Sequence, residues 1–222
     1  MLIISSKNFI YYGGVKNGLY HGEGNLYLPN GDYFQGTYKN GEFIKGKGRK
    51  TLKQSKIYEG ELGNGMITNG IIMTPLFTYR GGINSNFQMN GQGIQTYFIE
   101  GLRRYLIKNL RSAELETFFL NHLIFQGTFQ NDEIINGEGV IVFIDMSIYY
   151  GTIQNKQISG KGSMYYINGD SYSGMWKNNS YHGTGKFKSN SGNSFKGKWI
   201  EGFLQASRPN ISESMNFDKT NH

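Results

Sequence analysis

Aromatic residues and glycines recur among polar residues along this chain in a register of about 23 residues. An aromatic residue precedes each register glycine by two positions in most copies, and a Gly-x-Gly pair follows that glycine by nine or ten. The glycines that set the register are Gly13, Gly36, Gly60, Gly81, Gly127, Gly151, Gly174 and Gly197. A fixed period of this length indicates one supersecondary unit that is copied and stacked along the chain.

Each unit is predicted to be a β-hairpin. The cleanest copy, residues 11–32, places Asn17-Gly18 between two stretches of alternating apolar residues, and this pair favours a two-residue turn with positive φ. The same slot holds Asn40-Gly41, Asn64-Gly65, Asn131-Asp132, Asn155-Lys156 and Asn178-Asn179. Residues four apart share one face of a strand, so the aromatic residue and the large residue four positions later are predicted to form two rows on one side of a sheet.

The Gly-x-Gly pair lies in the strand after the turn. A glycine inside a strand marks a bulge or a place where another group approaches closely. We predict that the aromatic side chain of a neighbouring repeat lies over the glycine pair. The aromatic ring and the glycines would then be the two halves of one stacking joint.

These residues together resemble the MORN repeat, whose consensus runs approximately Tyr-x-Gly-x-Trp-x-x-Gly, then Gly-x-Gly, then Pro-Asn-Gly-Asp. The resemblance covers about residues 9–203. It implies an all-β fold, an elongated single-layer antiparallel sheet of stacked β-hairpin repeats. MORN arrays occur in ciliary radial spokes and other cytoskeletal assemblies, in membrane-junction proteins, and beside the catalytic domains of lipid kinases and lysine methyltransferases.

The register is interrupted once, because no glycine occurs between Gly101 and Gly127. The interval from Gly81 to Gly127 is 46 residues, two periods, which favours a decayed repeat, whereas leucines at near-helical spacing favour a helix. Both interpretations stay open. The predicted organisation is about four N-terminal repeats in 1–101, a degenerate repeat or helical insert in 102–124, about four C-terminal repeats in 125–203, and a polar tail in 204–222.

Composition narrows the class of protein. The formal net charge is +7, from 23 basic and 16 acidic residues without a long run of either sign, which is less than nucleic-acid-binding proteins usually carry. The absence of cysteine excludes a disulfide framework and a thiolate metal site. The longest apolar run, residues 140–144, is far shorter than the ~20 residues that span a bilayer. We expect an intracellular protein with no nucleic-acid partner.

No catalytic, cofactor or metal site is predicted. His21 and His182 occupy the same slot in two repeats, and a catalytic residue is rarely copied at a fixed period. The Gly-x-Gly motif recurs six times and lacks the strand-to-helix setting and the lysine of a phosphate-binding loop. We therefore expect a protein that is not an enzyme and needs no cofactor.

Two sets of residues are candidates for binding. A single-layer sheet is expected to leave some aromatic side chains accessible to a partner protein, the alternative being that they pack against the next repeat. The candidates are Tyr38, Phe129, Trp176 and Trp199. Lysines before the hairpin turn are candidates for binding anionic lipid, the alternative being that they keep the array soluble and block strand pairing. These are Lys16, Lys39 and Lys177.

The function predicted from the resemblance is an interaction scaffold in a cytoskeletal or axonemal assembly such as a radial spoke head. Its partners would be other proteins of a large complex, and an open end strand could also form a homodimer. The expected location is the cilium, axoneme or cytoskeleton. The alternatives are a peripheral adaptor that binds anionic phospholipids at the inner face of a membrane, and a regulatory subunit of a lipid kinase.

Overall fold

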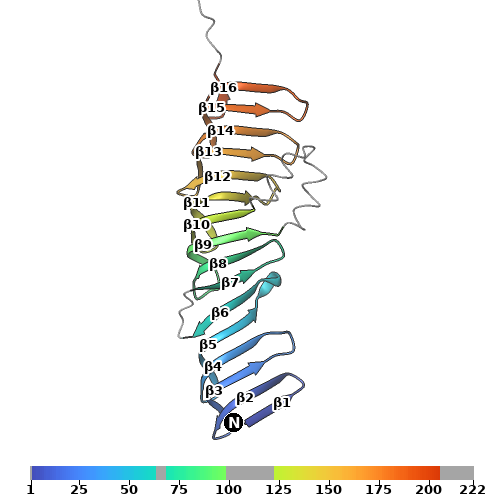
Figure 1. Ribbon diagram of the computed structural model, residues 1–222, viewed down its shortest axis with the longest axis vertical. Helices are drawn as coiled ribbons and strands as arrows, with labels where there is room; N and C mark the ends of the chain where they lie inside the picture. The colour runs from blue at the N-terminus through green and yellow to red at the C-terminus, as the bar shows by residue number, and fades with distance from the viewer. Residues whose placement is uncertain (1, 64–68, 99–122, 206–222) are drawn as a thin grey trace, which may run out of the picture.

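The computed structural model describes residues 2–63, 69–98 and 123–205, which form one antiparallel sheet with a short 3-10 helix, η1 (Lys53–Ser55) (Figure 1). The first nine strands are β1 (Leu2–Ser6), β2 (Phe9–Lys16), β3 (Leu19–Tyr27), β4 (Tyr33–Lys39), β5 (Glu42–Thr51), β6 (Ile57–Gly63), β7 (Asn69–Met73), β8 (Phe77–Ile83) and β9 (Met89–Tyr97). The remaining eight are β10 (Ile124–Gln130), β11 (Glu133–Val142), β12 (Ile148–Gln154), β13 (Gln157–Tyr165), β14 (Ser171–Lys177), β15 (Ser180–Lys188), β16 (Ser194–Ile200) and β17 (Phe203–Leu204).

The strands stack in sequence order along the long axis of the molecule (Figure 1). β9 pairs with β10, with Gly93 opposite Gly127, so one sheet joins the repeats of 1–101 to those of 125–203. The predicted all-β fold, an elongated antiparallel sheet of stacked hairpins, is confirmed. The helix or decayed repeat predicted for 102–124 lies outside the described residues up to residue 122, and the predicted tail lies outside them from residue 206.

The hairpin turns have the backbone conformation that their sequences predict. Asn17 and Gly18 have φ of 51° and 76°, and Lys156, the least suited residue in this slot, has φ of 65°. Asn40-Gly41, Asn131-Asp132 and Asn178-Asn179 also have positive φ. The turn predicted at Asn64-Gly65 lies outside the described residues. These turns line one long side of the sheet, the turn side, and longer loops such as 28–32 line the opposite loop side.

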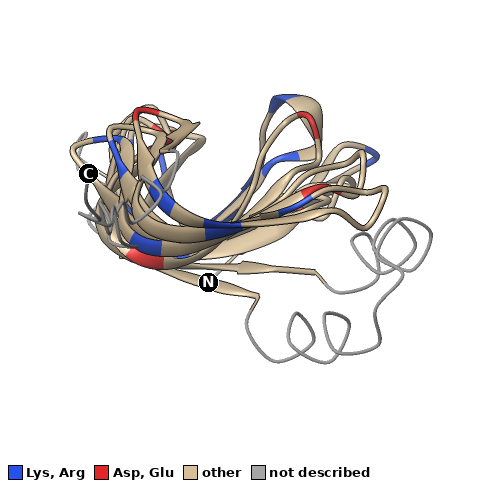
Figure 2. Ribbon diagram, turned by 90° about the horizontal axis from the view of Figure 1, so that it is seen from above, with Lys and Arg blue, Asp and Glu red and all other residues tan. Residues whose placement is uncertain are grey.

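The sheet is bent into a trough (Figure 2). The buried aromatic residues of the core lie on its inner face. The two long sides of the sheet approach each other across the trough, since Nζ of Lys56 on the loop side lies 3.0 Å from Oδ2 of Asp132 on the turn side. The ring at the start of the repeat motif is fully buried in six copies, at Tyr11, Tyr58, Tyr79, Phe125, Tyr149 and Tyr172. We call the opposite, convex side of the sheet the outer face.

Each of these rings covers the glycines of its own hairpin. A Cβ atom added to Gly162 would lie 2.7 Å from Cζ of Tyr149, and one added to Gly151 would meet the same ring. Gly151 and Gly162 are directly opposite in β12 and β13. The prediction that the ring comes from a neighbouring repeat is therefore wrong. Tyr149 and Gly151 share a strand face and the side chain leans along the strand, so the ring lies over its own hairpin.

The tyrosine hydroxyl completes this joint. Oη of Tyr149 donates a hydrogen bond to the carbonyl oxygen of Thr152, at 3.2 Å. The equivalent bond, from a tyrosine to the carbonyl three residues later, is made by Tyr11, Tyr58, Tyr79 and Tyr172. Burial of the ring raises the pKa of Tyr149 to about 12. The polar end of the buried ring is thus satisfied within its own hairpin.

The first glycine of the Gly-x-Gly pair has a different role. Gly160 has φ of 75°, and β12 and β13 shift register between Gly151 and Thr152. Such a shift is a β-bulge, and its left-handed residue favours glycine. The two glycines of one motif are therefore required for different reasons, backbone conformation at Gly160 and room for the ring at Gly162.

Candidate interaction surfaces

The four aromatic side chains predicted to be accessible lie in the core. Their exposed fractions are 2% for Tyr38, 1% for Phe129, 4% for Trp176 and 7% for Trp199. The expectation of exposure is wrong because the sheet bends around this face and rings of adjacent strands pack against one another there. Trp176, for example, packs edge to face against the ring of Tyr172 at 5.1 Å.

The two tryptophans join consecutive hairpins. Nε1 of Trp176 in β14 donates a hydrogen bond to the carbonyl oxygen of Gly162 in β13, at 3.1 Å. Nε1 of Trp199 in β16 makes the same bond to Gly185 in β15, also at 3.1 Å. These side chains therefore pack against the preceding repeat and are not available to a partner.

A cluster of large side chains is exposed on the outer face of the N-terminal strands. The ring of Tyr27 lies 6.3 Å from that of Tyr12 and 6.4 Å from that of Tyr33. Ile10 is directly opposite Tyr27, and the two side chains are 41% and 46% exposed. We call Ile10, Tyr12, Tyr27 and Tyr33 the tyrosine patch. Tyrosine is enriched at protein interfaces because it combines a large apolar ring with a polar end.

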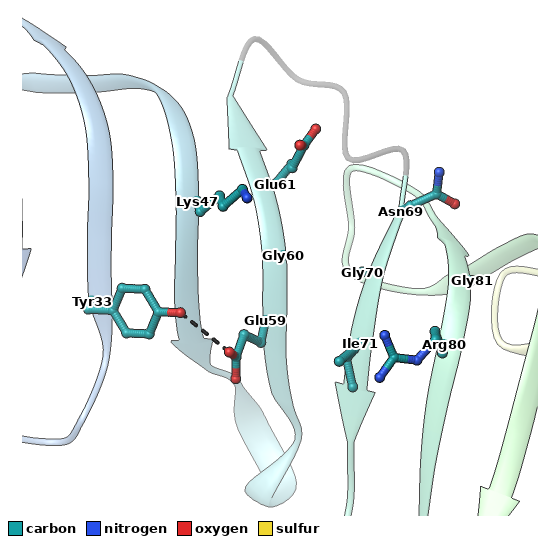
Figure 3. Close-up of a pocket in the computed structure, with 10 residues that line it drawn as sticks. All are labelled: Tyr33, Lys47, Glu59, Gly60, Glu61, Asn69, Gly70, Ile71, Arg80 and Gly81. Carbon is teal, nitrogen blue, oxygen red and sulfur yellow. Dashed lines mark hydrogen bonds between the residues drawn. The ribbon is translucent and has the colours of Figure 1, made fainter. Parts of the chain in front are cut away.

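A hollow of about 570 Å³, the outer hollow, adjoins the tyrosine patch on the same face (Figure 3). The hydroxyl of Tyr33 donates a hydrogen bond to Oε1 of Glu59 at 3.3 Å, and burial and the Glu59 carboxylate raise the pKa of Tyr33. Lys47 is opposite Glu61 in the strand register. The lining also includes Ile71 and Arg80, which are opposite each other in β7 and β8. The hollow offers charges of both signs around one apolar side chain.

Comparison with known protein families gives one match. The family described as MORN repeat matches residues 11–33, 149–171 and 172–194. These segments coincide with the hairpins β2–β3, β12–β13 and β14–β15, each with the loop that follows it. The chain is a MORN-repeat protein. Comparison with curated proteins finds no match.

The matched MORN repeats begin at Tyr11, Tyr149 and Tyr172. In all three the tyrosine covers a glycine of its own hairpin and its hydroxyl bonds the carbonyl three residues later. The MORN repeat is a non-catalytic module that stacks into an interaction scaffold, and this chain carries it at both ends of its described sheet.

The three lysines proposed for lipid binding lie on the turn side of the MORN array. Lys16, Lys39 and Lys177 end strands β2, β4 and β14, and each is exposed. At ~4.8 Å per strand, Lys16 and Lys39 are roughly 10 Å apart and Lys177 is roughly 50 Å further along. The first two are thus neighbours, the third is remote, and the three do not form one compact cluster.

A second hollow, the inner hollow, opens on the inner face of the MORN array and measures about 670 Å³. Its lining includes Phe77 and Met89 together with the Lys56–Asp132 ion pair. Oδ1 of Asp132 also accepts a hydrogen bond from the backbone N–H of Met89, at 2.7 Å. Asp132 therefore joins the two sides of the trough through Lys56 and is itself held in place by the N–H of Met89 on its own side.

Within residues 2–63, 69–98 and 123–205, no group of three or more histidine or acidic side chains is arranged to hold a metal ion. In the same ranges no helix has the length and the apolar character needed to cross a membrane.

The tyrosine patch was missed in the sequence because Tyr12, Tyr27 and Tyr33 lie outside the recurring motif positions. Strand alternation could have found it, because neighbouring residues in a strand point to opposite faces. Tyr12 follows the core residue Tyr11, and Tyr27 follows Leu26, which is opposite Tyr11. Tyr33 precedes Phe34, which is opposite Leu26.

Proposed function

We propose that this protein is a non-enzymatic scaffold that binds other proteins of a large assembly through the outer face of its sheet. The supporting observation is the tyrosine patch, in which Ile10 and Tyr27 expose 41% and 46% of their surfaces on a continuously hydrogen-bonded sheet. A rigid platform with exposed tyrosines and an adjoining hollow suits recognition of a protein surface, because little conformational entropy is lost on binding.

The assembly that we propose is cytoskeletal or axonemal, with a radial spoke head as the specific candidate. This part rests on the resemblance of the repeat array to MORN arrays of such assemblies and on the elongated shape (Figure 1). The seventeen strands of the described residues, stacked at ~4.8 Å, would let one chain contact partners at well separated points.

Fractionation of cells that carry a tagged copy tests this proposal. The tagged protein should stay in the insoluble cytoskeletal pellet after mild detergent extraction and should leave it in high salt together with its partners. Complete release by detergent together with membrane markers would contradict the scaffold proposal.

The alternative proposal is a peripheral membrane adaptor that binds anionic phospholipid through exposed lysines on the turn side. Lys16 and Lys39 support it, since both are exposed and lie on alternate strands. Replacement of Lys16, Lys39 and Lys177 by Glu should abolish binding to vesicles that contain phosphatidylserine. Unchanged vesicle binding by this variant would exclude the adaptor role for these lysines.

A further inference from the structure

The basic residues at the C-terminal end of the array are concentrated on one face. Residues 171–200 contain five lysines and no acidic residue, in a chain whose net charge is +7. Four of the five lie on the outer face of two adjacent strands, Lys186 and Lys188 in β15 and Lys196 and Lys198 in β16. We call these four residues the lysine patch.

The strand register brings like charges together. Lys186 is directly opposite Lys196, and Thr184 is directly opposite Lys198. Like charges in directly opposed positions destabilise an antiparallel pair. The sheet therefore holds positive charge here at a cost to its own stability, which a bound anion would offset.

The N-terminal strands of the same face show the contrasting arrangement. In β5 and β6, Lys47 is opposite Glu61 and Arg49 is opposite Glu59. Lys47 and Arg49 are thus each opposed by an acidic residue. The difference between the two ends makes the lysine patch a local feature of β15 and β16.

Neighbouring groups on the outer face do not neutralise the patch. Ser173 is opposite Lys186 on β14, and Ser171 and Ser194 flank Lys188 from the two adjacent strands. Among the described residues, the salt bridges join Lys56 to Asp132 and Lys156 to Glu133, which lie on other strands and loops. The patch therefore presents ammonium groups surrounded by hydroxyl groups, a setting with donors for carboxylate oxygens.

We propose that the lysine patch binds a carboxylate-rich segment of a partner protein in extended conformation. Lys186 and Lys188, like Lys196 and Lys198, are two residues apart on one strand, so their Cα atoms are separated by ~7 Å. Acidic residues at alternate positions of an extended segment have the same spacing. Such a segment lying between β15 and β16 would place successive acidic side chains beside Lys198, between Lys186 and Lys196, and beside Lys188.

The shape of the surface favours a protein segment over a membrane. The outer face is the convex side of the trough (Figure 2), so a flat bilayer would meet it along a narrow strip, whereas a single extended segment can follow a strand. The lysine patch is separate from the tyrosine patch, which lies on β2, β3 and β4. The proposal for the lysine patch therefore does not depend on which partner the tyrosine patch binds.

Fluorescence anisotropy of the full chain with a labelled peptide of alternating Glu and Ser tests the proposal. Binding should be detected at low ionic strength and should weaken as salt is added, because the charges are exposed. The K186Q/K196Q variant should bind about tenfold more weakly. The matched control K7Q/K45Q removes two exposed lysines at the N-terminal end of the array, far from the lysine patch, and it should bind within about twofold of the wild type.

Circular dichroism should show that K186Q/K196Q folds as the wild type does, because the substitution removes a repulsion. If it does not fold, K188Q/K198Q serves in its place with the same expected loss. Failure of the wild type to bind the peptide, an equal loss in the control variant, or lysine-dependent binding to phosphatidylserine vesicles without peptide binding would each overturn the proposal.

Discussion

The different roles of the two glycines in one Gly-x-Gly motif lead to a quantitative prediction. In β13, a Cβ atom at Gly162 would lie 2.7 Å from Cζ of the buried Tyr149 ring, whereas one at Gly160 would meet Thr152 only at 3.9 Å. Gly160 instead has φ of 75°, a conformation that disfavours alanine by about 1–2 kcal/mol. Gly162→Ala and Gly160→Ala therefore test steric room and backbone conformation separately.

The two costs can be estimated from these contacts. Gly162→Ala overfills the space under the ring, at about 1–3 kcal/mol. If the ring moves, the bond from Tyr149 to the Thr152 carbonyl is lost, at about 1 kcal/mol more. The expected loss of unfolding free energy is about 2–4 kcal/mol for Gly162→Ala. For Gly160→Ala it is about 0.5–1.5 kcal/mol, since alanine also restricts the unfolded chain.

Urea unfolding followed by tryptophan fluorescence measures both values, because the two tryptophans, Trp176 and Trp199, both lie in this C-terminal part of the sheet. A double-mutant cycle with Tyr149→Ala identifies the cause. In the Tyr149→Ala background, Gly162→Ala should leave the unfolding free energy almost unchanged. Gly160→Ala should lower it by as much as it does in the wild type. Equal costs for the two alanines, or an unchanged cost of Gly162→Ala without the ring, would refute the reasoning.

Three further predictions concern stability. Trp199→Phe should lower the unfolding free energy by about 1–3 kcal/mol, measured in urea by circular dichroism, because the carbonyl of Gly185 loses its buried indole donor; no loss would show that the bond between hairpins is unimportant. Asp132→Ala should lower the melting temperature more than Lys56→Ala, since Asp132 also accepts a backbone N–H from β9; the reverse order would contradict this. Burial raises the pKa of Tyr58 to about 12, above its unfolded value of ~10. The stabilisation by the buried phenol should therefore be complete below about pH 10 and be lost between about pH 10 and 12, measured as ellipticity in alkaline titrations. An unchanged unfolding free energy across that interval would argue against buried phenols.

The repeat period and the turn residues were sufficient to predict the hairpins. Asn17-Gly18 predicted its turn because asparagine and glycine tolerate positive φ, a property of the local chain alone. The side of the sheet on which the aromatic rings lie also followed from strand alternation. What the sequence could not supply was the bend of the sheet, which buries Trp176 and Trp199 on the inner face.

The contact between an aromatic ring and the glycines was predicted from the sequence, but the ring was assigned to a neighbouring repeat and not to the same hairpin. Complementarity between a large side chain and a glycine is visible in a sequence, but its partner depends on cross-strand register. The register places Gly162 opposite Gly151, beneath Tyr149 of the same hairpin. The lysine patch depends on register in the same way, since Lys186 and Lys196 are ten residues apart in the chain and directly opposed in the sheet.

Affinity capture with a tyrosine-patch variant tests the scaffold proposal most directly. Tyr27→Ser combined with Ile10→Thr changes two exposed side chains of the outer face, and Leu19→Ser changes a residue of similar exposure beside a hairpin turn. Proteins that co-purify with the wild type should be lost from the double variant and retained by the Leu19→Ser control. Retention of the same proteins by the double variant would contradict the claim that this face binds the partner.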